Sequence, residues 1–508
     1  MKKISIYLAI LTAITSHYST SLAQDTLPWH QEPYRPQIHF SPKKHWVNDP
    51  NGMVYHNGVY HLFYQHYPGG TTWGPMHWGH ATSKDLVHWE EQSIKLYPDT
   101  LGFIFSGSAV YDRNNTSGFG RDGKGPLVAI FTHHVDPSQT GGKNFQYQSL
   151  AYSNDEGKTW TKYAGNPVLR KPESTDFRDP KVLWYEPGKK WIMTLAVKDQ
   201  IEFYSSPDLK NWKYESEFGK NLGAHGGVWE CPDLVAFDYN GKKIWVLIVN
   251  LNPGAPNGGS GTQYFLGDFD GSRFVASHTD PRWMDFGPDN YAGITWSNTG
   301  DRRILIGWMS NWNYANEVPT KNWRNAMTVP RELSLQAAGD KLLLASRPVP
   351  ELKRLEGKPR LYRNIGAPET ELLPSPAPIQ LPALIELDAT GLSAWNLVFS
   401  NEVGEELELG FDKASGQYYI DRSRSGASSF HKEFAGRHSA PVFSATPGRK
   451  VTLLVDQSSI ELFADKGLTV MTELFFPSSP YSRFRLNLPA GGNMKSVRVV
   501  SLRSIHTH

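Results

Sequence analysis

The segment that decides the fold spans residues 49–64 and reads DPNGMVYHNGVYHLFY. An acid and a proline precede a short apolar run, a tight turn at Gly58, and a second run rich in aromatic and β-branched residues. The same order recurs after Asp179-Pro180 and after Glu230-Cys231-Pro232. The glycine of the turn follows the proline by eight, eight and nine residues in the three segments. Each unit therefore predicts two strands joined by a tight turn.

A second motif closes three such units, with a serine, an aspartate and a tryptophan within eight residues. It occurs in the ranges 83–89, 153–160 and 206–212. Repeated units of antiparallel strands are typical of propeller blades, whereas a β-sandwich with accidental similarity is the alternative. We predict an all-β chain with a β-propeller over residues 33–348. Because the first strand of each blade lines the central channel, Asp49, Asp179 and Glu230 should meet at one end of it.

The sequence changes character after residue 348. Residues 349–380 are charged and contain several prolines, which predicts a linker. Strand patterns resume in the ranges 385–388, 407–411, 451–456 and 459–464. Alternation of apolar and polar residues between turn signals predicts a β-sandwich over residues 381–508. We expect this domain to brace the propeller; a separate ligand-binding module is the alternative.

Composition excludes several function classes. The chain has 508 residues and a net charge of +2, from 52 Lys and Arg against 50 Asp and Glu. This balance gives no broad positive surface for nucleic acid or an anionic membrane. Cys231 is the single cysteine, so an intramolecular disulfide and a multi-cysteine metal site are excluded.

The N-terminus has the features of a secretory signal over residues 1–23. Basic residues precede an apolar run at 4–14, and small residues follow at 21–23. The apolar run is too short for a membrane span, which takes roughly 20 residues. We therefore expect an exported protein, periplasmic or extracellular, with no membrane anchor.

The three acids have the chemistry that cleavage of an acetal needs. One carboxylate stays ionised near the developing oxocarbenium charge, and another carboxyl group holds a proton for the leaving oxygen. Asp49, near Asn48 and Asn51, suits the ionised role. Glu230 suits the proton donor, because an apolar wall of Trp229 and Cys231 would favour the protonated form. Asp179 should stay ionised beside Arg178 and bind substrate hydroxyls. Each acid alone is better explained as a turn residue or a strand cap, but three acids in equivalent blade positions and aromatic settings favour a functional site.

Six motifs within residues 46–232 resemble one known family in the same order, and the resemblance as a whole covers nearly the entire mature chain. They are WVNDPNG (46–52), LFYQH (62–66), WG (73–74), FSGS (105–108), FRDP (177–180) and WECP (229–232). They are similar to motifs of the glycoside hydrolase family 32 β-fructosidases, which include invertases, inulinases and levanases. Val47 stands where the family has methionine, a change that leaves the acid in place.

This resemblance implies a five-bladed propeller followed by a β-sandwich, a retaining mechanism, and no metal or cofactor. It makes Asp49 the nucleophile and Glu230 the general acid/base. Arg178 and Asp179 would grip fructose hydroxyls and stabilise the transition state. The terminal fructose pocket would be lined by Asn48, Gln65, Trp73, Phe105, Ser106 and Trp312. Histidines at 77, 80, 133 and 134 suggest a metal, but no acid or cysteine completes a ligand set.

The segments 252–265 and 307–324 resemble exo-acting inulinases and levanases. The implied activity is removal of terminal fructose from levan or inulin, and from sucrose. Alternatives are an endo-levanase or endo-inulinase, a plain invertase, a fructosyltransferase, and a non-catalytic fructan-binding propeller. Residues 285–292 resemble a further family segment near the active site, or form a blade turn. The oligomeric state is not predicted.

Overall fold

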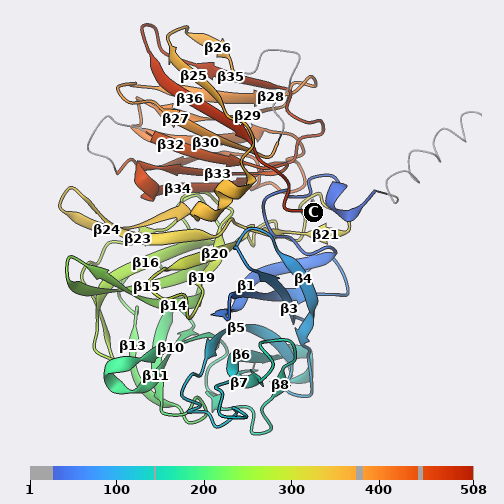
Figure 1. The fold of residues 1–508 in the computed structure, drawn as a ribbon, viewed down its shortest axis with the longest axis vertical. Helices are drawn as coiled ribbons and strands as arrows, with labels where there is room; N and C mark the ends of the chain where they lie inside the picture. Colours follow the sequence, from blue (N-terminus) through green and yellow to red (C-terminus); the bar gives the residue numbers. More distant parts are fainter. Residues whose placement is uncertain (1–26, 142–144, 373–380, 444–449, 507–508) are drawn as a thin grey trace, which may run out of the picture.

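A computed structural model describes residues 27–141, 145–372, 381–443 and 450–506. It confirms an all-β chain in which a propeller is followed by a β-sandwich, drawn at the bottom and the top of Figure 1. The predicted signal segment lies outside the described residues. Within the described ranges, no helix is long and apolar enough to cross a membrane. Short 3-10 turns occur at η1 (Trp29–Gln31), η2 (Pro137–Gln139), η3 (Glu186–Gly188), η4 (Pro350–Leu355) and η5 (Asp465–Gly467).

Five antiparallel sheets make up the blades of the propeller. The first contains β1 (His45–His56), β2 (Val59–Tyr67), β3 (His77–Ser83) and β4 (Glu90–Leu96), with β21 (Trp323–Arg324) parallel to β1. The second contains β5 (Phe103–Tyr111), β6 (Leu127–Val135), β7 (Phe145–Ser153), β8 (Thr161–Lys162) and β9 (Leu169–Arg170). The third contains β10 (Arg178–Tyr185), β11 (Lys190–Val197), β12 (Gln200–Ser206) and β13 (Lys213–Phe218).

The fourth and fifth sheets follow the same plan. The fourth contains β14 (Val228–Tyr239), β15 (Lys242–Asn252), β16 (Gly261–Phe269), β17 (Phe274–Ala276) and β18 (Arg282–Trp283). The fifth contains β19 (Tyr291–Thr295), β20 (Ile304–Met309), β22 (Ala326–Met327), β23 (Arg331–Ala338) and β24 (Lys341–Pro348). The first strands β1, β5, β10, β14 and β19 contact one another in a closed ring, which makes them the lining of the central channel.

The repeats seen in the sequence correspond to fixed places in the blades. The acid–proline units are the hairpins β1–β2, β10–β11 and β14–β15. The serine–aspartate motifs are turns after the third strand of the first three blades, where Asp85, Asp155 and Asp208 accept backbone N–H bonds. Such side-chain-capped turns recur because the connection to the fourth strand has the same geometry each time.

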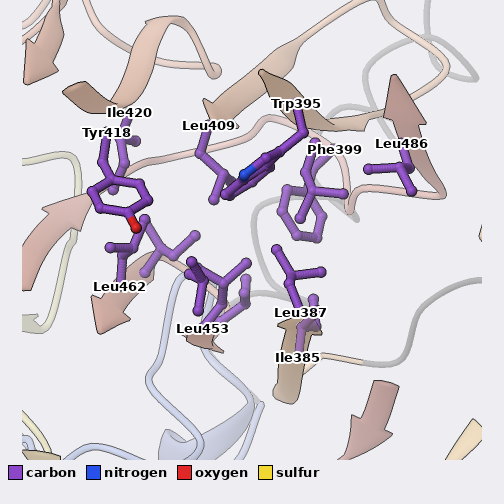
Figure 2. Packing of buried hydrophobic residues seen from close by; sticks show 14 of the residues in the cluster. Ile385, Leu387, Trp395, Phe399, Leu409, Tyr418, Ile420, Leu453, Leu462 and Leu486 are labelled. Carbon is purple, nitrogen blue, oxygen red and sulfur yellow. The ribbon is translucent and has the colours of Figure 1, made fainter. Parts of the chain in front are cut away.

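Two six-stranded sheets form the sandwich. One contains β25 (Arg360–Ile365), β36 (Met494–Ser501), β27 (Ala383–Asp388), β32 (Lys450–Val455), β33 (Ser459–Ala464) and β34 (Thr469–Leu474). The other contains β26 (Glu369–Glu371), β35 (Arg483–Asn487), β28 (Trp395–Ser400), β29 (Glu406–Asp412), β30 (Gln417–Arg424) and β31 (Arg437–Ala440). Figure 2 shows inward side chains of both sheets, among them Ile385, Trp395 and Leu453, interdigitated in one core.

The expected linker is part of the folded structure over much of its length. Strand β25 pairs with β36, and β26 pairs with β35, so both sheets take a strand from before residue 381. Three of the six prolines in the expected linker, Pro374, Pro376 and Pro378, lie in 373–380, outside the described residues. Pairing with the last strands of the chain is a long-range event that the local composition does not reveal.

The sandwich packs on the fifth blade through a buried, partly ionic interface. Arg331 of β23 donates to Glu461 of β33, with both side chains at most 1% exposed. His39 bonds Asp456 and Glu461, each at 2.8 Å. Apolar side chains from both domains continue this contact, including Val329, Leu352, Leu454, Phe463 and Val470. The sandwich is therefore packed against the propeller through a buried interface and is not joined to it only by a linker.

Candidate active site

The three acids lie where the channel-lining strands leave their regular pairing. The ladder is interrupted between Val47 and Pro50 in β1, between Arg178 and Lys181 in β10, and between Glu230 and Asp233 in β14. Proline has no N–H to offer a ladder, so it is tolerated at such bulges. A bulge also re-aims neighbouring side chains, which explains why acid and proline occur together.

The register shows that the acids do not occupy identical positions. Arg178 and Glu230 are each the last paired residue before the bulge, whereas Asp179 and Cys231 follow them with left-handed φ values of 64° and 44°. Glu230 therefore corresponds to Arg178, and Cys231 to Asp179. Asp49, Asp179 and Glu230 still meet as predicted, because these two neighbouring strand positions face the same end of the channel.

Asp49 is partly exposed, and its two oxygens accept different hydrogen bonds. The Asn48 amide donates to Oδ1 at 2.9 Å, and the Ser106 hydroxyl donates to Oδ2 at 2.6 Å. Burial and the nearby Glu230 carboxyl raise the pKa of Asp49, while these two donors lower it. Asn51 takes a different role from the one expected, because its amide donates to the Asp49 backbone carbonyl.

Glu230 is not enclosed by the apolar wall that the sequence suggested. Trp229 turns into the core of its blade and donates to the Ala224 carbonyl, because successive strand residues face opposite sides. The side chain of Glu230 is 23% exposed, and its Oε1 accepts from Arg178 at 3.1 Å. Its Oε2 accepts from the hydroxyl of Tyr291. A cation and a phenol therefore fix the two oxygens of this carboxyl group.

Asp179 differs most from its sequence-based description. Its side chain is 5% exposed, and Arg178 lies 4.0 Å away because that guanidinium pairs with Asp176 at 2.6 Å and with Glu230. Burial raises the pKa of Asp179 to about 7; Arg178 lowers it, whereas Glu230 and Asp49 raise it further. Burial therefore opposes the effect of the cation on this carboxyl group, and the ionised state expected for Asp179 from the sequence stays a prediction.

Cys231 links two of the acids. Its backbone N–H donates to Asp179 Oδ2 at 3.0 Å, and its thiol lies 3.5 Å from Asp49 Oδ2 and 3.7 Å from Asp179 Oδ2. Burial, followed by Asp179 and Asp49, raises the pKa of the thiol well above its usual value. The thiol is therefore a neutral donor between two carboxyl groups.

Most of the predicted pocket residues surround Asp49. Gln65 lies in β2 opposite the Asn48–Asp49 bulge and is 2% exposed; its amide nitrogen lacks a partner among the described residues. Trp312 stacks on Trp46, whose indole N–H donates to Asn48 at 2.7 Å.

Phe105 and Trp73 form an aromatic rim beside this cluster. Phe105 precedes Ser106 and stacks on His134 with ring centroids 4.2 Å apart. Trp73 is 40% exposed and meets Phe105 edge to face, with centroids 6.1 Å apart. The roles assigned to these side chains stay predictions, although the geometry brings them to one place.

Tyr291 is the more important of two residues that sequence reasoning missed. It opens β19 and contacts Glu230, although the fifth blade carries no acid–proline motif. The available signal was the similarity of residues 285–292 to a family segment, which a blade turn explained equally well. Gln146 was also missed; it accepts from the Phe177 N–H at 2.8 Å and from Arg178 at 3.4 Å.

The histidines considered as metal ligands have other partners. His133 bonds Ser149 at 2.7 Å, and His80 stacks on Phe63. In the ranges that the structure describes, no group of three or more His, Cys, Asp or Glu side chains could hold a metal ion.

Comparison with known proteins identifies the family. The model of the glycosyl hydrolases family 32 N-terminal domain matches residues 39–346, and the family 32 C-terminal model matches residues 351–505. The chain belongs to glycoside hydrolase family 32. The chain is similar to the levanase of Bacillus subtilis. The two sequences are 44% identical over 99% of this chain and 76% of the levanase.

Two further proteins agree with this family assignment. An extracellular exo-inulinase of Aspergillus ficuum is 40% identical over 92% of this chain and 94% of its own length. The crystal structure of exo-inulinase from Aspergillus awamori superimposes with a TM-score of 0.85 at 38% identity, covering 94% of this chain and 99% of that chain. The similarity to family 32 thus extends over both the propeller and the sandwich.

Proposed function

We propose that this chain is an exported, retaining exo-β-fructosidase that removes terminal β-D-fructofuranosyl residues from levan or inulin and from sucrose. Its relatives are named levanase and exo-inulinase, which supports fructan as the substrate class. The observation that carries the proposal is that Asp49 and Glu230 lie at the same end of the channel. Each carboxyl group accepts hydrogen bonds from a different set of donors. Two carboxyl groups with distinct surroundings are what glycoside hydrolysis requires.

In the first step Asp49 attacks the anomeric carbon of the terminal fructose. The bond from this carbon to Asp49 forms as the bond to the leaving oxygen breaks, and Glu230 gives its proton to that oxygen. Ser106 and Asn48 favour ionised Asp49 and hold its oxygens in a fixed orientation. We expect the two carboxyl groups to lie roughly 5–5.5 Å apart, as retention requires.

In the second step water hydrolyses the fructosyl-enzyme. Glu230 takes a proton from the water, which attacks the anomeric carbon and releases Asp49. Arg178 remains cationic: burial lowers its pKa, but Glu230, Asp179 and Asp176 together raise it above its ordinary value. The guanidinium therefore stays beside Glu230 through both steps.

Asp179 is suited to bind sugar hydroxyls. Burial raises the pKa of Asp179, and a carboxyl group donates a hydrogen bond when protonated and only accepts when ionised. The buried amide of Gln65 adds a donor, and Trp73 and Phe105 offer apolar faces to the ring. We assign the terminal fructose pocket to these residues with Asn48, Ser106, Arg178 and Trp312.

The remaining parts of the proposal concern processing and domains. Residues 1–23 serve as the signal that is removed on export, to the periplasm or the medium. The propeller domain carries the chemistry, and the sandwich braces it through the buried interface with β23.

Product analysis on levan, inulin and sucrose tests this function. We expect fructose as the sole product on a polymer from the earliest time point, with Asp49→Asn as the inactive control. Early oligosaccharides would show an endo-acting enzyme. Transfer products at high sucrose would show a fructosyltransferase, and fructan binding without release of sugar would show a binding module.

A further inference from the structure

We propose that Arg422 of the sandwich positions the acid/base carboxyl of Glu230, acting through Asp289 and Tyr291. The inference rests on the proposed function, since it concerns proton transfer by Glu230. Arg422 is a positioning residue and not a catalytic one, because Asp289 and Tyr291 stand between it and the carboxyl group of Glu230. It gives the sandwich a part in catalysis beyond bracing the propeller.

The first link is a buried ion pair between the domains. Arg422 in β30 donates to Asp289 Oδ2 at 2.5 Å, and both side chains are fully buried. The guanidinium also donates to the Tyr314 hydroxyl at 2.9 Å and to the Phe434 carbonyl at 2.6 Å. A rigid, forked donor is needed to hold these partners together.

The second link fixes the segment that precedes Tyr291. Asp289 accepts from the Tyr314 hydroxyl at 2.6 Å and from the Leu474 N–H at 2.8 Å. Its own N–H donates to the Thr472 carbonyl, so both the side chain and the backbone are tied to β34. Gly287 is required here, since a Cβ would lie 2.2 Å from the Thr472 backbone.

The third link is between Tyr291, two residues after Asp289, and Glu230 in the active site. Tyr291 opens β19 directly after the tied segment, and its hydroxyl donates to Glu230 Oε2. Titratable groups near enough to act on this phenol by their charge include Glu230 and Cys231 of β14 and Asp49 of β1. Burial, then Glu230, raises the pKa of Tyr291 well above its ordinary value, so the phenol remains a donor.

These links leave the orientation of Glu230 dependent on the sandwich. Arg178 holds one carboxyl oxygen from within the propeller, and Tyr291 holds the other. Displacement of Asp289 would shift the start of β19 and with it the phenol. The proton on Glu230 would then be misaligned with the leaving oxygen. This slows the cleavage of substrates whose leaving group must be protonated, and not of those whose leaving group departs as an anion.

The experiment compares kcat/KM on sucrose with kcat/KM on a nitrophenyl β-D-fructofuranoside. The nitrophenolate leaves with little help from an acid, whereas the glucose of sucrose needs the proton. Arg422→Lys keeps the positive charge but loses the planar guanidinium with its several N–H donors. Tyr291→Phe removes the hydroxyl group that donates to Glu230. Gln336→Ala is the control, because it removes an interface hydrogen bond, from Gln336 of β23 to the Lys466 carbonyl of the sandwich, that does not lead to Glu230. Asp289→Asn replaces Arg422→Lys if that variant is not recovered folded.

We expect Arg422→Lys and Tyr291→Phe to lose about tenfold on sucrose and less than about threefold on the nitrophenyl substrate. Gln336→Ala should leave the ratio of the two values unchanged. Equal losses on both substrates for Arg422→Lys, or no loss, would overturn the proposal. An unchanged ratio in Tyr291→Phe would overturn it as well. A wild-type protein that releases no fructose from sucrose would instead refute the proposed function.

Discussion

His39 makes the stability of the domain interface depend on pH. Its imidazole is fully buried between Asp456 and Glu461. Burial alone would lower its pKa, but the hydrogen bonds and charges of the two acids raise it from 6.5 to about 9. Each pKa unit corresponds to about 1.4 kcal/mol, so this group contributes roughly 3 kcal/mol to the free energy of unfolding.

The sign follows from a folded-state pKa that is raised. The unfolded chain releases this proton near pH 6.5, whereas the folded chain keeps it up to about pH 9. The contribution is therefore complete below about pH 6.5 and is lost as the pH rises through about 9. Glu461 does not titrate in this window: burial raises its pKa, but Arg331 and His39 bring it to about 2.

Urea unfolding of the wild type and His39→Gln from about pH 6 to about pH 10 measures this effect. The difference in unfolding free energy should shrink by roughly 3 kcal/mol across the range, because glutamine carries no titrating charge. A difference that is constant with pH would refute a charged His39. A difference that grows with pH would show that the buried imidazole is neutral.

Three further substitutions test the active site. Glu230→Gln should lower kcat/KM on sucrose about 10²- to 10⁴-fold, because it removes the proton donor, while the melting temperature stays close to that of the wild type; normal turnover would remove Glu230 from the mechanism. Ser106→Ala deletes the 2.6 Å bond to Asp49 and should cost about 2 kcal/mol in transition-state stabilisation, seen as roughly a thirtyfold fall in kcat/KM; an unchanged value would show that Asp49 needs no such donor. Trp73→Ala should raise KM about tenfold with little change in kcat, since the exposed indole binds substrate and transition state alike; a pure kcat effect would contradict a binding role.

Local sequence patterns were sufficient to predict the hairpins of three blades and the end of the channel where the three acids meet. Asp49-Pro50 and Asp179-Pro180 mark bulges in channel-lining strands, and both features are set within a few residues. The fifth blade was not visible as a repeat, because Tyr291 and its neighbours carry no acid–proline pair. Strand β25 was missed because its partner β36 lies at the other end of the sandwich sequence.

Charge states were the hardest property to predict from neighbours in the chain. Arg178 adjoins Asp179 in sequence, yet its guanidinium turns to Asp176 and Glu230. Trp229 adjoins Glu230, yet it packs in the blade core. In a strand, adjacent side chains face opposite sides, so the partners of a buried acid come from other blades.

Trapping the covalent intermediate tests the central claim that Asp49 is the nucleophile. In Glu230→Ala, a nitrophenyl β-D-fructofuranoside should still react with Asp49, while release of the sugar is slow because the base for water is missing. Mass spectrometry after digestion should then find one fructosyl group on the peptide that contains Asp49. A fructosyl group on the peptide with Asp179, or a first product of inverted configuration without any adduct, would contradict the account.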